Sequence, residues 1–177
     1  MSDRAEQTNR NVWKKRVLIL MSVALLARIA AAVLIEQYVQ NADRSFLVEG
    51  DANGYWILAQ QIVSGKDYSI YTPPRRVLRM PGFPILLATS IKLFGDSVLA
   101  ARIVLALVGT ACCWLTYCLG NRLYSPQTGF WAAMFVAVNP LHIGSSVLIL
   151  SETWFTFWML VSLLGLHWLL ASNRSTV

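Results

Sequence analysis

The sequence predicts an all-α membrane protein with about four transmembrane helices and an amphipathic, helix-containing outer loop between the first and the second. Hydrophobic residues make up 56% of the 177 residues, against about 45–50% in a typical soluble domain. Charged residues make up 14%, well below the usual share of about 25%. Long apolar runs lie near residues 17–36, 97–120, 126–148 and 152–171. A soluble globule of this size would need a larger polar coat, so a bilayer is the expected solvent.

The first crossing is expected in the run from Val17 to Ile35, which only Ser22 and Arg28 interrupt. A helix of that length spans about 28 Å, close to the thickness of the hydrocarbon core. A basic cluster precedes it within residues 1–16: Arg10, Lys14, Lys15 and Arg16. By the positive-inside rule this cluster holds the N-terminus in the cytoplasm. A cleaved signal peptide is the alternative, and Arg28 disfavours it because a charge interrupts the segment before the small residues near 30–32.

Arg28 is itself a candidate for interaction, because it lies within the first apolar run. A charge at the centre of a membrane helix costs about 3 kcal/mol unless it finds a partner. We therefore expect Arg28 to face other parts of the protein, a carboxylate or a ligand phosphate. The alternative is that its long side chain snorkels to the interface.

The remaining crossings are predicted from the length of the apolar runs and from the residues that cap helices. The second, near 97–120, returns the chain to the cytoplasm. Ser125 and Pro126 are typical of an N-cap and a first helical position, so they begin the third, which should break near Pro140. The last crossing, near 152–171, is apolar and rich in tryptophan.

Four crossings place both termini in the cytoplasm. The membrane domain then covers residues 17–172, with a cytoplasmic tail at 173–177, and the connection at 37–96 becomes a long outer loop. A nucleic-acid-binding function is excluded by this arrangement, because the basic residues behind the net charge of +6 would be divided between opposite sides of the membrane.

Two helices are expected within the outer loop. Residues 52–64 place apolar side chains three and four apart, and Gly65 follows as a C-cap. This pattern predicts a short amphipathic helix on the outer leaflet. Residues 69–80 are expected to be irregular, and the Pro-Gly-Phe-Pro corner at 81–84 opens a second helix that ends at Phe94. Asp96 or Ser97 then caps the following crossing.

Two carboxylates stand out because each is flanked by apolar sequence and both are predicted at the outer face. They are Asp51, beside Glu49, and Glu152, about a hundred residues later. Ionisable groups near a bilayer are often functional, so both acids are candidates for a site. The alternative is that Asp51 is a helix N-cap and Glu152 a first-turn residue stabilised by the helix dipole.

The outer loop also carries arginines that a simple positive-inside count does not explain. Arg79 comes two residues before the rigid corner at 81–84, which would fix its direction as a phosphate clamp requires. Arg75 and Arg76 are candidates for the same phosphate, or for anionic lipid headgroups.

The cysteine and histidine residues of the sequence give little support for a metal site or for redox chemistry. Cys112, Cys113 and Cys118 lie in one apolar run without the spacing of metal ligands, so we interpret them as lipid-buried thiols. His142 and His167 do not form a metal pair. No metal site is predicted, and the cofactor is undetermined, with a divalent cation left open.

Several of these residues occur together, in order, in one known family. The motifs are Glu49-Gly50-Asp51 with Tyr55 and Ala59, Arg79 to Pro84, Leu93-Phe94-Gly95 with Ala101-Arg102, Asn139-Pro140, and Ser151-Glu152. This order resembles the N-terminal region of the GT-C integral membrane glycosyltransferases, in the branch of the bacterial relatives of protein O-mannosyltransferases and the lipid A aminoarabinose transferase.

The resemblance implies transfer of a sugar from a polyprenyl-phosphate carrier to a lipid, glycan or protein at the outer face of the bacterial inner membrane. It implies that Asp51 is the general base and that Glu152 is the second catalytic acidic residue, which either orients the acceptor or substitutes for part of a metal site. It further implies donor-phosphate binding by Arg79 with Arg75, Arg76 or Arg102, and positioning of the substrate by Glu49 and Tyr55.

The family usually has more crossings than this chain provides. We therefore expect either a fragment or a chain that assembles with a second polypeptide supplying further helices. The competing hypothesis is a small non-catalytic membrane subunit whose outer arginines bind anionic lipids.

Overall fold

The computed structural model describes residues 2–71, 73–75 and 78–174. Within these residues the chain is all-α, which confirms the predicted class. The seven helices are α1 (Ser2–Asn41), α2 (Glu49–Ser64), α3 (Gly82–Phe94), α4 (Val98–Leu123), α5 (Pro126–Val138), α6 (Pro140–Ser145) and α7 (Glu152–Arg174).

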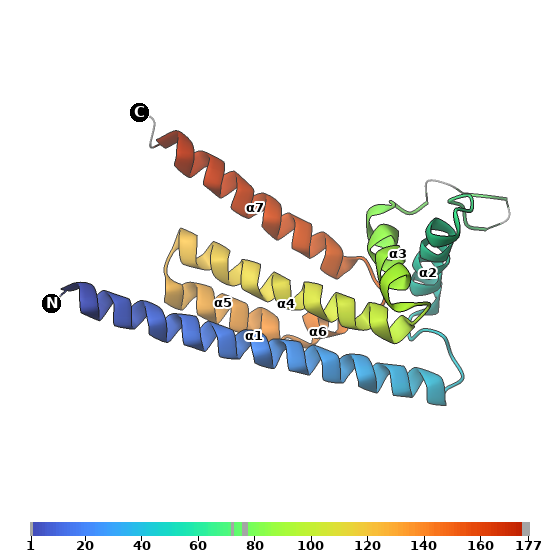
Figure 1. Cartoon of the computed structure of the whole chain (residues 1–177), viewed down its shortest axis with the longest axis horizontal. Helices are drawn as coiled ribbons and strands as arrows, with labels where there is room; N and C mark the ends of the chain where they lie inside the picture. The colour runs from blue at the N-terminus through green and yellow to red at the C-terminus, as the bar shows by residue number, and fades with distance from the viewer. Residues whose placement is uncertain (1, 72, 76–77, 175–177) are drawn as a thin grey trace.

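Three of these helices are long and apolar enough to cross a bilayer, as judged over the described part of the chain. The spans are Val12–Asn41, Val98–Leu123 and Glu152–Asn173. In Figure 1, α1, α4 and α5 lie side by side, and α7 leans away from them toward its C-terminus. Both termini lie at one end of this bundle, and α2 and α3 lie across the other end (Figure 1).

The third predicted crossing is divided into two short helices. Ser125 caps α5 by accepting a hydrogen bond from the Thr128 backbone N–H, with Pro126 at the first position, as expected. The helix ends at Asn139, whose side chain accepts from the Leu141 N–H and begins α6. Pro140 is the reason for the break, because it lacks the N–H that would continue the ladder.

Arg28 lies at this break and is fully buried, so the snorkelling alternative is wrong. Its guanidinium donates to the Val136 carbonyl at 3.4 Å and the Ala137 carbonyl at 3.5 Å, as well as to Ala24 in its own helix. In a continuous helix, residue 140 would donate to Val136, four residues earlier. Arg28 therefore supplies a donor that Pro140 cannot, in a region where an unsatisfied carbonyl costs several kcal/mol.

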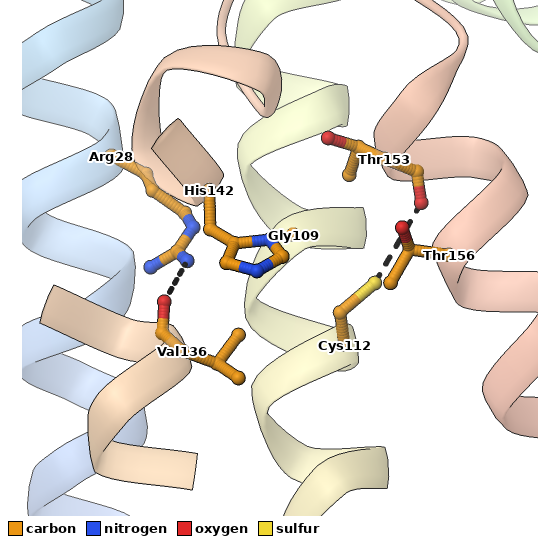
Figure 2. A pocket seen from close by; sticks show the side chains of 7 residues that line it. All are labelled: Arg28, Gly109, Cys112, Val136, His142, Thr153 and Thr156. Carbon is orange, nitrogen blue, oxygen red and sulfur yellow. Dashed lines mark hydrogen bonds between the residues drawn. The ribbon is translucent and has the colours of Figure 1, made fainter. Parts of the chain in front are cut away.

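Figure 2 shows the small cavity that borders this contact, with His142 and Gly109 beside the Arg28 side chain. On its far side, the Cys112 thiol donates to the Thr153 carbonyl at 3.7 Å (Figure 2). Cys112 and Cys113 are buried between helices, so the expectation that they face lipid is wrong. The helix contacts, which the apolar run alone does not reveal, exclude lipid there.

Glycines allow α4 and α5 to pack with their backbones close together. A Cβ atom on Gly129 would lie 2.5 Å from the Tyr117 carbonyl oxygen and 2.8 Å from the Asn121 nitrogen. A Cβ atom on Gly120 would lie 2.7 Å from the Gly129 Cα. Small residues at such crossings let membrane helices gain close van der Waals contact.

Replacing Gly129 with alanine is therefore expected to destabilise the bundle by about 1–3 kcal/mol, because the added methyl group meets backbone that cannot move aside. Thermal unfolding in detergent measures the effect. Gly165→Ala in α7 is the matched control, since a Cβ atom there meets nothing within 4 Å. Equal melting temperatures for the two variants would contradict the close packing of α4 on α5.

The helices α2 and α3 are fixed to the bundle by one apolar cluster. Trp56 of α2 and Phe83 and Leu87 of α3 pack with Leu105 of α4 and with Ile149, which precedes α7. The expected helix at 52–64 begins three residues earlier, at Glu49, and ends as predicted at Gly65, which adopts the left-handed conformation with φ 65°. This cluster holds the start of α2 next to the start of α7.

Candidate functional site

The candidate site forms at the end of the bundle opposite the termini, where Asp51 and Arg79 make an ion pair. The Arg79 Nη2 atom donates to the Asp51 Oδ1 atom at 2.6 Å. Asp51 lies in the first turn of α2, but the N-cap position belongs to Val48 and no side chain caps the helix. The capping interpretation of Asp51 is therefore wrong, because its carboxylate is bonded to Arg79 instead.

The two side chains differ in exposure. The Arg79 side chain is 11% exposed and the Asp51 side chain is 64% exposed. A short charge-assisted hydrogen bond thus ties a mostly buried cation to a carboxylate that still faces solvent. This arrangement leaves the Asp51 carboxylate accessible to an incoming molecule, while the ion pair with the buried Arg79 side chain fixes its orientation.

Three neighbours hold Arg79 in place. Its guanidinium carbon lies 4.3 Å from the centre of the Tyr55 ring, in a cation–π contact. Its Nε atom is buried and lies 2.8 Å from the position that a Cβ atom on Gly54 would take. The Tyr68 hydroxyl donates to the Arg79 backbone carbonyl at 2.9 Å. Arg79 therefore packs flat between the backbone of α2 and an aromatic ring.

Electrostatics keep this cation charged. Burial by itself would lower the pKa of Arg79, but the interactions with Asp51 and Tyr55 outweigh burial and raise the pKa. Burial has the opposite effect on Tyr68, because the charged form of tyrosine is the deprotonated one. It raises the pKa of Tyr68, with a further contribution from Tyr55 and a smaller opposing one from Arg79. Both groups therefore keep their protons at neutral pH, so the site holds a permanent positive charge beside an acidic side chain.

Tyr55 connects this ion pair to the start of α7. Its hydroxyl donates to the Ser151 Oγ atom at 3.1 Å, and its ring meets Phe83 edge-on at 4.9 Å. Ser151 directly precedes Glu152, the exposed first residue of α7. Because Tyr55 is one helical turn from Asp51, the structure brings the neighbourhoods of Asp51 and Glu152 together at one end of the bundle.

The other predicted residues are distributed around this centre. Arg75 is exposed in a turn, where its backbone exchanges two hydrogen bonds with Ile70. Arg76 lies outside the described residues. Glu49 is exposed and lines a separate polar pocket of about 220 Å³ with residues of the loop between α1 and α2.

Arg102 has a different partner from the one that sequence reasoning gave it. Its Nε atom lies 3.2 Å from the Glu36 Oε2 atom, and the Arg102 side chain is only 1% exposed. Glu36 was not among the predicted site residues. A signal existed, since Glu36 follows the first apolar run directly and Arg102 lies near the start of the second, so both come to the same side of the membrane. Their pairing lowers the cost of burying each charge.

Metal ions are bound in proteins by clusters of ligating side chains. Among the residues that the structure describes, no group of three or more His, Cys, Asp or Glu side chains is placed to hold a metal ion.

The fold and the site define a polytopic α-helical membrane protein with an acid–arginine pair held at one end of its bundle. A family model, described as dolichyl-phosphate-mannose-protein mannosyltransferase, matches residues 78–176, more than half of the chain. The chain therefore belongs to this family of GT-C glycosyltransferases, which confirms the resemblance found in the sequence. Arg79 and Glu152 lie within the matched residues, whereas Asp51 precedes them. Neither the curated proteins nor the solved structures contain a match to this chain.

Proposed function

We propose that the chain is a glycosyltransferase that moves a sugar from a polyprenyl-phosphate donor to a lipid, glycan or protein acceptor at the outer face of the bacterial inner membrane. The observation that carries the proposal is the Asp51–Arg79 ion pair, held next to the start of α7 in a chain of this family. An acid and a cation in this arrangement suit a reaction in which a hydroxyl loses a proton and a phosphate leaves.

The proposed topology has four crossings, formed by α1, α4, α5 together with α6, and α7. Both termini lie at the same end of the bundle, as an even number of crossings requires (Figure 1). The basic cluster at that end favours the cytoplasmic side. Asp51, Arg79 and Glu152 then face the outer side, where a polyprenyl-linked sugar would be presented.

In the proposed reaction, Asp51 accepts the proton of the acceptor hydroxyl as that oxygen attacks the anomeric carbon of the sugar. A new bond forms between the acceptor oxygen and the anomeric carbon. The bond from that carbon to the phosphate oxygen breaks, and its electron pair leaves with the polyprenyl phosphate. A general base of this kind contributes typically about 10²- to 10⁴-fold in rate.

Arg79 has two proposed roles. Its ion pair with Asp51 keeps the carboxylate oriented, and its fixed positive charge stabilises the phosphate as negative charge develops there. Arg75, exposed in the nearby turn, is proposed as a second contact for the phosphate. Glu152 is proposed to orient the acceptor, with Tyr55 positioning the site through Ser151 and Glu49 contributing on the substrate side.

Donor binding tests this function. The protein in lipid nanodiscs is titrated with a radiolabelled polyprenyl-phosphate sugar, and Arg79→Gln is expected to weaken binding by about 10- to 100-fold, the effect of losing a charged hydrogen bond of about 1.5–3 kcal/mol. Arg44→Gln, which removes an exposed cation from the same outer loop, is the control. Absence of donor binding, together with equal effects of Arg79 and Arg44 on anionic-lipid binding, would favour the non-catalytic subunit instead.

Gly54 gives a second, more selective test of the same site. In Gly54→Ala, the new methyl group would lie only 2.8 Å from the Arg79 Nε atom, and the flexible arginine side chain would move aside at little cost in stability. We expect about tenfold weaker donor binding with an unchanged melting temperature. Gly50→Ala, in the same helix, meets nothing within 4 Å and serves as the control. Equal donor affinities for the two variants would show that the position of Arg79 is irrelevant.

A further inference from the structure

An apolar groove runs between α2 and α3, away from the candidate site. The ion pair occupies the N-terminal ends of the two helices, where Asp51 meets Arg79 and Tyr55 meets Phe83. The groove lies along α3 and beside the C-terminal end of α2, and it has a volume of about 430 Å³. We call it the α2–α3 groove; its lining includes Ile62, Val63, Ile85, Ala88, Lys92 and Leu93.

The walls of the α2–α3 groove are large apolar side chains that the protein itself leaves uncovered. Ile62 and Val63 on α2 are 36% and 44% exposed, and Ile85 and Leu93 on α3 are 52% and 69% exposed. Ala88, which also lines the groove, is almost fully buried. Exposing such surface to water costs about 25 cal/mol per Å², which favours a cover of apolar chemistry.

Polar groups in the groove are few. Thr89 also lines it, but its hydroxyl already donates to the Ile85 carbonyl at 2.8 Å. Lys92 is the single charged residue in the lining of the α2–α3 groove, and it is exposed. An apolar trough with one cation matches a molecule that has a hydrocarbon chain and a single anionic group.

The position of the groove in the fold indicates which kind of molecule would bind there. The two helices lie across the end of a bundle that contains three candidate membrane spans (Figure 1). At that depth the surrounding medium passes from hydrocarbon to headgroups, where amphipathic helices bury their apolar faces. We propose that the α2–α3 groove binds one acyl chain of an anionic glycerophospholipid, with the Lys92 ammonium pairing with the lipid phosphate. This site is separate from the proposed transfer site and does not rest on the proposed function.

Photo-crosslinking tests the proposal on the full chain. The protein is reconstituted in phosphatidylcholine vesicles that contain a small fraction of phosphatidylglycerol with a diazirine on one acyl chain, and labelled peptides are mapped by mass spectrometry. We expect label on residues 57–66 and 82–94, about fivefold more than with a phosphatidylcholine probe. A factor of five corresponds to about 1 kcal/mol, the attraction of one basic residue to an anionic surface.

Variants distinguish specific binding of the lipid in the α2–α3 groove from general contact of these helices with the bilayer. Lys92→Gln is expected to lower labelling of these peptides by about fivefold, whereas Lys66→Gln, which removes an exposed cation just beyond α2, should leave it unchanged. Ala88→Phe should block the groove. Lys92 is exposed, so its variant keeps the test informative if Ala88→Phe does not fold.

Three results would overturn the proposal. Equal labelling by the two lipid probes would show contact without headgroup recognition. Equal effects of Lys92→Gln and Lys66→Gln would show that Lys92 is not part of a site. Loss of the label on addition of unlabelled polyprenyl phosphate, but not of unlabelled phosphatidylglycerol, would identify a different occupant.

Discussion

Replacing Asp51 with asparagine is expected to abolish sugar transfer, lowering the rate by about 10²- to 10⁴-fold, because the amide cannot accept the proton of the acceptor hydroxyl. The side chain is mostly exposed and is similar in size to asparagine, so folding and membrane insertion should be unaffected. Transfer from a polyprenyl-phosphate sugar, measured in membranes that contain the protein and its acceptor, checks this result.

Asp43→Asn is a matched control for Asp51→Asn. Asp43 is also an exposed acid close to α2, and its backbone has a positive φ of 52°, which asparagine tolerates well. This control is expected to transfer sugar at the wild-type rate. If Asp51→Asn were as active as Asp43→Asn, the assignment of Asp51 as the base would be wrong.

The second large effect is expected at Arg28, in the middle of the bundle. Arg28→Met removes the donors to the Val136 and Ala137 carbonyls at the α5–α6 break. Each buried carbonyl left unsatisfied costs about 1–3 kcal/mol, partly offset because an expensive buried charge is also removed. We expect a net loss of about 2–4 kcal/mol in the free energy of unfolding, measured in detergent.

Pro140 allows the cause of this loss to be isolated. If Arg28 is needed because Pro140 lacks an N–H, then Pro140→Ala should recover part of the stability in the Arg28→Met background, since the new N–H can donate to Val136. In the wild-type background, Pro140→Ala should bring no such gain. A double-mutant cycle with no coupling between the two positions would contradict this explanation.

The sequence predicted the helices well because their signals are local. Apolar runs, Ser125 with Pro126, the break at Pro140 and Gly65 as a C-cap each depend on neighbouring residues, and each appears in the structure. The capping interpretation of Asp51 was wrong because a competing partner, Arg79, lies far along the chain. Local patterns give no information on such a competition.

Partners distant in sequence were the part that could not be predicted. Arg28 was expected to meet protein, a carboxylate or a phosphate, but its partners are backbone carbonyls about 110 residues later, which have no sequence signature. Arg102 was assigned to phosphate and instead pairs with Glu36. The contact between Tyr55 and Ser151, which joins α2 to α7, likewise depends on how α2 and α3 pack on the bundle.

Thiol accessibility in intact cells tests the central claim most directly, namely that Asp51 and Glu152 share one external face. In a chain whose three native cysteines are replaced by alanine, Asp51→Cys and Glu152→Cys should both react with a membrane-impermeant maleimide added outside. Tyr124→Cys, in the exposed turn between α4 and α5 at the other end of the bundle, should react only after permeabilisation. Labelling of Asp51→Cys and Glu152→Cys from opposite sides of the membrane would contradict the account.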